Sequence, residues 1–186
     1  KYNFPNPHGG GTAYMNAVDE NGLGISLIQS NFYGIGSRIG VGNYGFFLHN
    51  RGCGFNLIRG HPNNLGPNKK PLHTLSPTLW SKNGSLEFIT GTRGGRYQPQ
   101  LLAQTILPYI LGESSFEEIM KKPRWTIEYF GSNTSSNIKF EFIKEPEISS
   151  LEDKGHKILV EDKLNGGYGP ISTIYKNSNE KFVGVP

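Results

Sequence analysis

The feature that most limits the fold of this chain is a turn signal near its start. Two short runs that mix apolar and polar residues, 12–19 and 23–30, are separated by a segment ending in Asn21-Gly22. Asn-Gly between two such runs is a strong signal for a β-hairpin, because both residues tolerate the positive φ of a tight turn. The pattern therefore predicts two antiparallel strands.

A run of three glycines, Gly9 to Gly11, lies directly before the first expected strand. Glycine loses more backbone entropy on ordering than any other residue, so we expect residues 1–11 to form a flexible linker. The sheet should then begin at Thr12, and residues 12–186 should form one domain region.

A second hairpin is expected where Asn83-Gly84 separates apolar runs at 78–80 and 86–90. Long loops rich in glycine and proline are expected at 34–45 and 51–72, and such loops are commonly either functional or disordered. The remaining expected strands are short apolar runs at 46–49, 124–129, 139–142, 157–160, 171–175 and 181–185.

Helices are expected at three places. The strongest pattern covers residues 98–111, with Pro99 in the first turn and Pro108 as a kink in the last. Its apolar face is expected to contain Leu102, Ile106, Tyr109 and Ile110. A shorter helix at 115–121 has Ser115 as its N-cap, followed three residues later by Glu118, and a third lies near 147–154. The expected fold class is α+β.

Length, charge and cysteine content exclude several classes of protein. A chain of 186 residues fits one domain. The net charge of +4 is dispersed, which argues against a nucleic-acid partner, and no apolar run is long enough to cross a membrane. Cys53 is the single cysteine, so no intrachain disulfide or multi-cysteine zinc site can form. The histidine spacing suggests no metal, and no cofactor is expected. Because the chain starts with Lys1 in place of Met, we expect it to be a fragment or a processed product.

Thr12 has an unusual position, directly after a glycine run and at the start of a strand. If the Gly11–Thr12 bond were cut, Thr12 would gain an α-amine with an ordinary pKa of about 7.7 to 8.0 beside its own hydroxyl. Such an amine can accept the hydroxyl proton and activate the oxygen as a nucleophile. The alternative is an ordinary threonine at the start of a strand.

Gly94-Gly95 lies between an expected strand and an expected helix. Adjacent glycines allow close approach of backbone N–H groups to a developing oxyanion, as acyl transfer requires. The alternative is a simple turn between the two elements.

These features occur in an order that resembles the small, nucleophile-bearing subunit of the γ-glutamyltranspeptidase family, which belongs to the N-terminal nucleophile hydrolases. The resemblance is carried by the segments Thr12 to Gly22, Gly34-Ile-Gly36, Lys69 to Thr78, Gly94-Gly95 and Lys122-Pro-Arg124. It implies a four-layer αββα sandwich, of which this chain supplies about half.

The resemblance also implies roles for individual residues. Thr12 corresponds to the threonine that autocatalytic cleavage exposes as the nucleophile, and Ser30 to a hydroxyl residue that hydrogen-bonds it. Asn31 corresponds to an asparagine that lines the substrate site. Gly94 and Gly95 correspond to the oxyanion-hole pair. The strand pattern alone leaves an alternative for Ser30, namely that it is an ordinary polar residue at the end of a strand.

The chain departs from the transpeptidases at their substrate-binding residues. Gly54 occupies the position of an acidic residue that holds the substrate α-amine, while His73 and Thr74 replace two serines that hold the α-carboxylate. The segments Asn50 to Phe55 and Pro71 to Thr74 are more similar to transpeptidase-like acylases and amidohydrolases. Arg51 has replaced an uncharged or acidic residue. Either it pairs with a carboxylate of an acyl group that lacks a free amine, or it is a solvated loop charge.

The resemblance implies an amide hydrolase or acyltransferase with a small-molecule amide substrate and a large subunit cut from the same precursor. It leaves a dimer of heterodimers open. A leader could lie on the upstream half; otherwise the cytoplasm is slightly favoured. The alternative function is a catalytically silent, unprocessed relative that acts as a binding or structural protein, because the amine of Thr12 stays blocked while Gly11 is attached.

Overall fold

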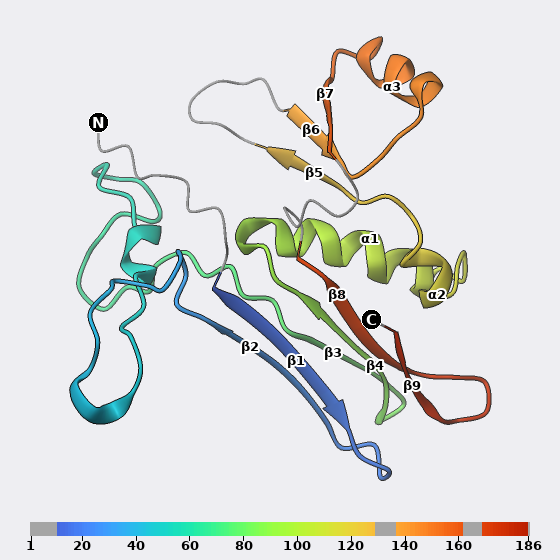
Figure 1. Ribbon diagram of the computed structural model, residues 1–186, viewed down its shortest axis with the longest axis horizontal. Coiled ribbons are helices and arrows are strands. Elements are labelled where there is room, and N and C mark those ends of the chain that lie inside the picture. Colours follow the sequence, from blue (N-terminus) through green and yellow to red (C-terminus); the bar gives the residue numbers. More distant parts are fainter. Residues whose placement is uncertain (1–10, 129–136, 162–168, 186) are drawn as a thin grey trace.

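The structure is a computed structural model that describes residues 11–128, 137–161 and 169–185. Of the expected linker, only Gly11 lies within these ranges. The strands described are β1 (Thr12–Val18), β2 (Gly24–Ser30), β3 (Thr78–Lys82), β4 (Ser85–Thr92), β5 (Trp125–Glu128), β6 (Asn137–Phe140), β7 (Lys157–Val160), β8 (Ile171–Lys176) and β9 (Phe182–Val185). The helices are α1 (Gln98–Ile110), α2 (Phe116–Ile119) and α3 (Glu145–Glu152), with 3₁₀ turns η1 (Gly42–Tyr44), η2 (Arg51–Gly54) and η3 (Gly95–Tyr97). Helices and sheets together confirm the α+β class (Figure 1).

The first expected hairpin is present. Strands β1 and β2 pair antiparallel from Thr12 opposite Ser30 to Val18 opposite Gly24. In the turn, the Asp19 carboxylate accepts the backbone N–H groups of Asn21 and Leu23 at 2.9 and 2.8 Å. The local turn chemistry therefore fixes the register that brings Thr12 and Ser30 together.

The central sheet is antiparallel and has the strand order β3-β4-β8-β9. At the β3-β4 turn, Asn83 and Gly84 have φ values of +51° and +81°, as a tight hairpin requires. One face of the sheet packs against α1 and α2 through an apolar core: Phe88, Leu102, Ile106, Phe116 and Ile119. Ser115 caps α2 and forms the expected capping box with Glu118.

The β1-β2 hairpin covers the opposite face of that sheet. Tyr14 lies against Gly91, where an added Cβ would come 2.2 Å from the tyrosine ring, and Gly24 faces Ile89. Asn16 donates a hydrogen bond of 3.2 Å to the Ser172 carbonyl of β8. The order of layers is thus hairpin, sheet, helix (Figure 1).

The third sheet, β5-β6-β7, attaches to the edge of α1. Gln100 and Gln104 use their side-chain amides to bond the free backbone edge of β5: the N–H groups of Ile127 and Trp125 donate to them at 2.7 and 3.1 Å. Two glutamines therefore take the place of a neighbouring strand. In the described part of the chain, no helix has both the length and the apolar character of a membrane span.

Two expectations were wrong. Residues 46–49 form no strand, because Phe47 makes only an isolated bridge to Gly40 and the segment closes an irregular loop. On α1, Leu101 is fully buried whereas Ile110 is 49% exposed. Ile110 lies in the last turn of the helix, where only Tyr109 reaches the apolar core.

Candidate active site

Thr12 and Ser30 form the centre of the site. They occupy opposite positions at the open end of the hairpin, and their Oγ atoms lie 2.8 Å apart. The Ser30 hydroxyl also accepts the backbone N–H of Phe32 at 3.0 Å. With one lone pair engaged by Phe32, the serine is held in an orientation that keeps its oxygen against Thr12.

Gly11 lies in very close contact with a loop that follows β2. A Cβ on Gly11 would lie 2.3 Å from the Gly34 carbonyl oxygen, so only glycine fits there without a backbone shift. Gly36 has the same constraint against the Leu48 carbonyl, and its φ is +84°. Gly34-Ile-Gly36 was expected within a loop and as one of the segments that carry the family resemblance; the structure shows that the Gly34 carbonyl packs against Gly11, directly before Thr12.

Gly94 and Gly95 have φ values of +120° and +56°, which other residues rarely adopt. Contacts along the two layers show where the pair lies relative to Thr12. Gly24, at the far end of the hairpin, faces Ile89, while Tyr14 faces Gly91. The end of β1 at Thr12 therefore lies at the same end of the layers as the end of β4 at Thr92, two residues before Gly94 (Figure 1).

Arg51 is buried, with 8% of its surface exposed. Its Nη1 donates to the Thr74 Oγ1 at 2.9 Å, and its guanidinium stacks 4.0 Å from the centroid of the Phe32 ring. Burial lowers the pKa of the Arg51 guanidinium from its ordinary value. The alternative of a solvated loop charge is therefore wrong.

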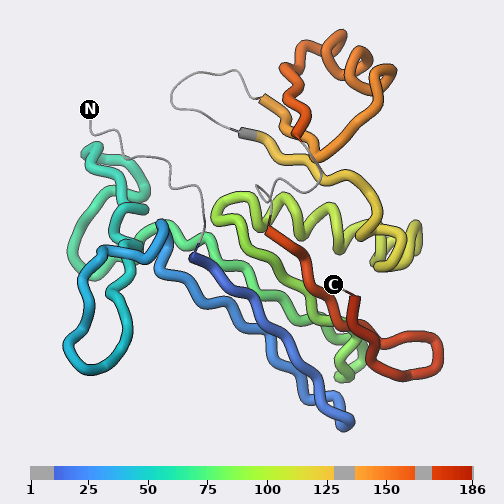
Figure 2. The backbone as a smooth tube through the Cα atoms, in the orientation of Figure 1, coloured from blue at the N-terminus to red at the C-terminus, as the bar shows by residue number. Residues whose placement is uncertain are grey.

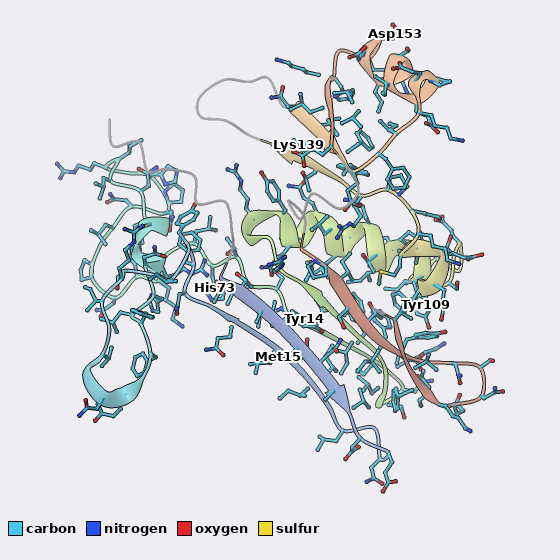
Figure 3. The ribbon with its side chains drawn as sticks, viewed as in Figure 1. Tyr14, Met15, His73, Tyr109, Lys139 and Asp153 are labelled. Atoms are coloured by element: carbon cyan, nitrogen blue, oxygen red, sulfur yellow. The ribbon has the colours of Figure 1, made fainter. Side chains whose placement is uncertain are left out.

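The other three expected binding residues differ in their surroundings. Asn31 is half-buried and accepts the Asn50 N–H through its carbonyl at 3.1 Å. Gly54 packs against the segment before Thr74, with a Cβ position 3.1 Å from the Leu72 carbonyl oxygen. His73, which is labelled in Figure 3, is exposed and has no hydrogen bond among the described residues.

The loops that contain these residues gather beside the beginning of β1 (Figure 2). Asn50 ties them together, because its side chain accepts the Tyr33 N–H at 2.9 Å and donates to the Gly36 carbonyl at 3.0 Å. The roles of Asn50 in joining these loops and of Phe32 in contacting Ser30 and Arg51 were not predicted from the sequence. A signal existed for Asn50 in its place within the Asn50 to Phe55 motif, but none existed for Phe32. Across the described ranges, no cluster of three or more His, Cys, Asp or Glu side chains suits a metal ion.

Solved structures share this fold. A mutant γ-glutamyltranspeptidase from Helicobacter pylori superposes with a TM-score of 0.75 at 21% identity, covering 92% of this chain and 96% of that one. Cephalosporin acylase from Bacillus halodurans gives a TM-score of 0.72 at 30% identity, covering 87% of this chain and 29% of that one. The chain thus shares its α+β fold with these solved structures.

The family follows from the sequence match. Residues 1–185 match the family described as Gamma-glutamyltranspeptidase, and the chain belongs to that family. It is 32% identical to an oxamate amidohydrolase proenzyme of Klebsiella pneumoniae, over 96% of this chain and 35% of the relative. It is 33% identical to a glutathione hydrolase-like proenzyme of Bacillus subtilis, over 89% of this chain and 31% of the relative. The chain spans about a third of the length of these relatives.

Proposed function

We propose that this chain is the nucleophile-bearing part of an amide hydrolase or acyltransferase that is activated by cleavage before Thr12. One observation carries the proposal: the Thr12 hydroxyl lies 2.8 Å from that of Ser30, directly after a glycine that packs against a backbone carbonyl. Relatives from this family are named as proenzymes, which supports a precursor that is cut.

Cleavage would use the same oxygen as later catalysis. The Thr12 Oγ attacks the Gly11 carbonyl carbon, the C–N bond breaks, and the acyl group passes from nitrogen to oxygen. Water then opens the resulting ester, which leaves a carboxylate on Gly11 and a free amine on Thr12. Ser30 orients the attacking oxygen in this step.

Turnover would follow the same chemistry on a substrate. The Thr12 hydroxyl adds to the substrate amide carbon while its proton moves to the α-amine of Thr12. The C–N bond breaks, the departing amine takes that proton, and an ester remains on Thr12. Water releases the acid in a hydrolase, whereas an acceptor amine forms a new amide in a transferase.

The N–H groups of Gly94 and Gly95 would bind the oxyanion in both steps. Their positive φ values allow the two successive N–H groups to be aimed in directions that ordinary residues rarely permit. One such donor is worth roughly 2.7 to 4 kcal/mol in comparable sites. A small-molecule amide is the proposed substrate, with no cofactor or metal.

The proposed partner is the upstream half of the same precursor. On the outer face of the β1-β2 hairpin, the side chains of Met15, Ile25 and Leu27 are 45%, 54% and 46% exposed. Met15 is labelled on this hairpin in Figure 3. A strand face with this much exposed apolar surface usually packs against another layer. The missing helical layer of an αββα sandwich would cover it.

The test is N-terminal sequencing and intact mass of the full-length precursor after prolonged incubation. Wild type should yield a new chain that begins with Thr12. Thr12→Ala should remain intact, and Thr12→Ser, which keeps a hydroxyl, should still be cleaved. If the folded wild-type protein stays uncleaved under all conditions, Thr12 has no free α-amine to act as the base. The catalytically silent alternative is then favoured.

A further inference from the structure

The N–H groups of Gly94 and Gly95 belong to two peptide groups whose carbonyl ends are held by different contacts. A trans peptide is a rigid plane in which the C=O and the N–H point in opposite directions. The direction of the Gly94 N–H is therefore fixed by whatever holds the Arg93 carbonyl. In the same way, the direction of the Gly95 N–H is fixed by whatever holds the Gly94 carbonyl.

The Gly94 carbonyl is held by a local turn. It accepts the backbone N–H of Tyr97 at 3.1 Å, across η3. This hydrogen bond joins residues that are close in the sequence and needs no other part of the chain. The Gly95 N–H is therefore directed by the turn itself.

The Arg93 carbonyl is held by the side chain of Thr92 and by a distant glycine. The Thr92 hydroxyl is fully buried and donates to the Arg93 carbonyl at 3.0 Å. It is also within hydrogen-bond distance of the Gly169 and Pro170 carbonyls, at 3.1 and 3.0 Å, so one proton is shared by two segments of the chain. Gly169 packs so closely that a Cβ there would lie 2.5 Å from the Arg93 carbonyl oxygen. The direction of the Gly94 N–H thus depends on a segment far along the chain.

A further contact holds Gly169 itself in place. Its carbonyl accepts a hydrogen bond of 2.6 Å from Arg124 Nη1. The buried Glu141 carboxylate fixes Arg124 in turn, because it accepts the guanidinium Nε at 2.8 Å. Hydrogen bonds from a charged donor are stronger than neutral ones. The segment that contains Lys122 and Arg124, for which the proposed mechanism has no role, therefore supports the backbone beside the oxyanion glycines.

We propose that Thr92 and Gly169 are positioning residues for the oxyanion hole. Together they hold the Arg93 carbonyl and so direct the Gly94 N–H toward the oxyanion. Thr92 is fully buried and has no access to a substrate, so it acts through the backbone. This inference rests on the proposed amide-cleaving function and adds the residues on which one of its two donors depends.

The test compares two threonines of β4 in the full-length precursor. Thr92→Val removes the shared hydroxyl at nearly equal volume, whereas Thr92→Ser keeps a hydroxyl. Thr90→Val is the matched control, because Thr90 is equally buried but its hydroxyl bonds that of Thr173 at 2.7 Å. Intact mass follows the rate of cleavage before Thr12. Turnover is measured on the p-nitroanilides of acetic, succinic and γ-linked glutamic acid, with the one that wild type cleaves fastest.

Thr92→Val should slow precursor cleavage roughly 10- to 100-fold and lower kcat by a similar factor. This is less than the roughly 100- to 1,000-fold loss in kcat when an oxyanion donor is removed, because the Gly94 N–H is still present but poorly directed. KM should change less than about threefold, since no substrate contact is lost. Thr92→Ser should keep most of both rates. Thr90→Val should keep both rates while lowering the urea midpoint about as much as Thr92→Val, which separates positioning from stability.

Gly169→Ala tests the second contact. The added Cβ would press on the Arg93 carbonyl oxygen, so cleavage and kcat should both fall at least about tenfold. Gly184→Ala, in β9 of the same sheet, is the control, because a Cβ there meets nothing within 4 Å. It should behave as wild type.

The outcomes separate this inference from the proposed function. If the folded wild-type precursor is not cleaved and turns over no anilide, the proposed function is contradicted, and this inference with it. If wild type is active and Thr92→Val is as fast as wild type, or no slower than Thr90→Val, only the positioning role is contradicted. A rise in KM with kcat unchanged would also overturn it, because that pattern indicates lost substrate binding.

Discussion

The hydroxyl groups of Thr12 and Ser30 face each other across the first residue pair of the β1-β2 hairpin, 2.8 Å apart. The contact depends on the hairpin register, because a slip of one residue would turn Ser30 to the opposite face. Two residues on separate strands thus form one unit, and the unit can be tested by removing a single oxygen.

Ser30→Ala should slow both precursor cleavage and amide turnover by about 10- to 100-fold, since a hydrogen bond to a reacting hydroxyl is lost. Ser30→Thr restores an oxygen at the same position and should retain most of the activity. Cleavage half-time and kcat/KM report the two steps. Equal rates in wild type and Ser30→Ala would show that this contact is structural only.

Gly11→Ala should block or strongly slow cleavage without destabilising the rest of the fold. The added Cβ would lie 2.3 Å from the Gly34 carbonyl oxygen, and a backbone atom cannot move aside cheaply. Gly184→Ala is the matched control, because a Cβ there meets nothing within 4 Å. Gel analysis of cleavage over time distinguishes them; unchanged processing of Gly11→Ala would refute the constraint.

Gly91→Ala should lower the free energy of unfolding by about 1–3 kcal/mol, the usual cost of overpacking. Its Cβ would lie 2.2 Å from the Tyr14 ring, between the hairpin and the central sheet. Tyr14→Leu in the same chain should recover part of the loss by removing the ring. A double-mutant cycle from urea unfolding measures this coupling, and purely additive losses would argue against a direct contact.

The hydroxyl of Tyr175 should lose its proton at a higher pH than an ordinary tyrosine. Its hydroxyl donates to the Glu117 carboxylate at 2.5 Å, and this bond raises the pKa of Tyr175 to about 12. Because the phenol holds its proton more tightly in the folded state, its stabilising contribution is full below the ordinary pKa of 10.0 and is lost as the pH rises through about 12. Glu117→Gln removes the charge and should bring the Tyr175 pKa back toward its ordinary value.

The opposite holds for Glu117, whose pKa is lowered chiefly by the same hydrogen bond. Its contribution is present above the ordinary pKa of 4.5 and is lost as the pH falls through the folded-state value. Tyr175→Phe should therefore lower the free energy of unfolding between the ordinary pKa of Glu117, 4.5, and that of Tyr175, 10.0. The variant should also show a weaker dependence of this free energy on pH below and above that range. Difference titration of tyrosinate absorbance and urea unfolding across pH test this pair. If the absorbance that Tyr175→Phe loses is centred near the ordinary pKa of 10.0, the raised pKa of Tyr175 is contradicted.

The elements that sequence analysis located correctly are those that local interactions determine. Asn21-Gly22 and Asn83-Gly84 specify their hairpins because few other residues tolerate the turn conformation. Ser115 and Glu118 cap α2 within three residues of each other. The expected strand at 46–49 failed for the converse reason, since an apolar run becomes a strand only when a neighbouring strand can pair along it.

For the candidate site, the sequence alone determined which residues lie near the hairpin end, because the turn sets the register that joins Thr12 to Ser30. It could not decide whether Arg51 was solvated or buried. That depended on Phe32 and Thr74, 19 and 23 residues away in the chain. The contact of Gly11 with Gly34 was equally inaccessible, because it arises where two loops meet. The backbone conformation of a turn depends on the residues of the turn itself, whereas the burial of a charge depends on which distant segments the tertiary structure packs around it.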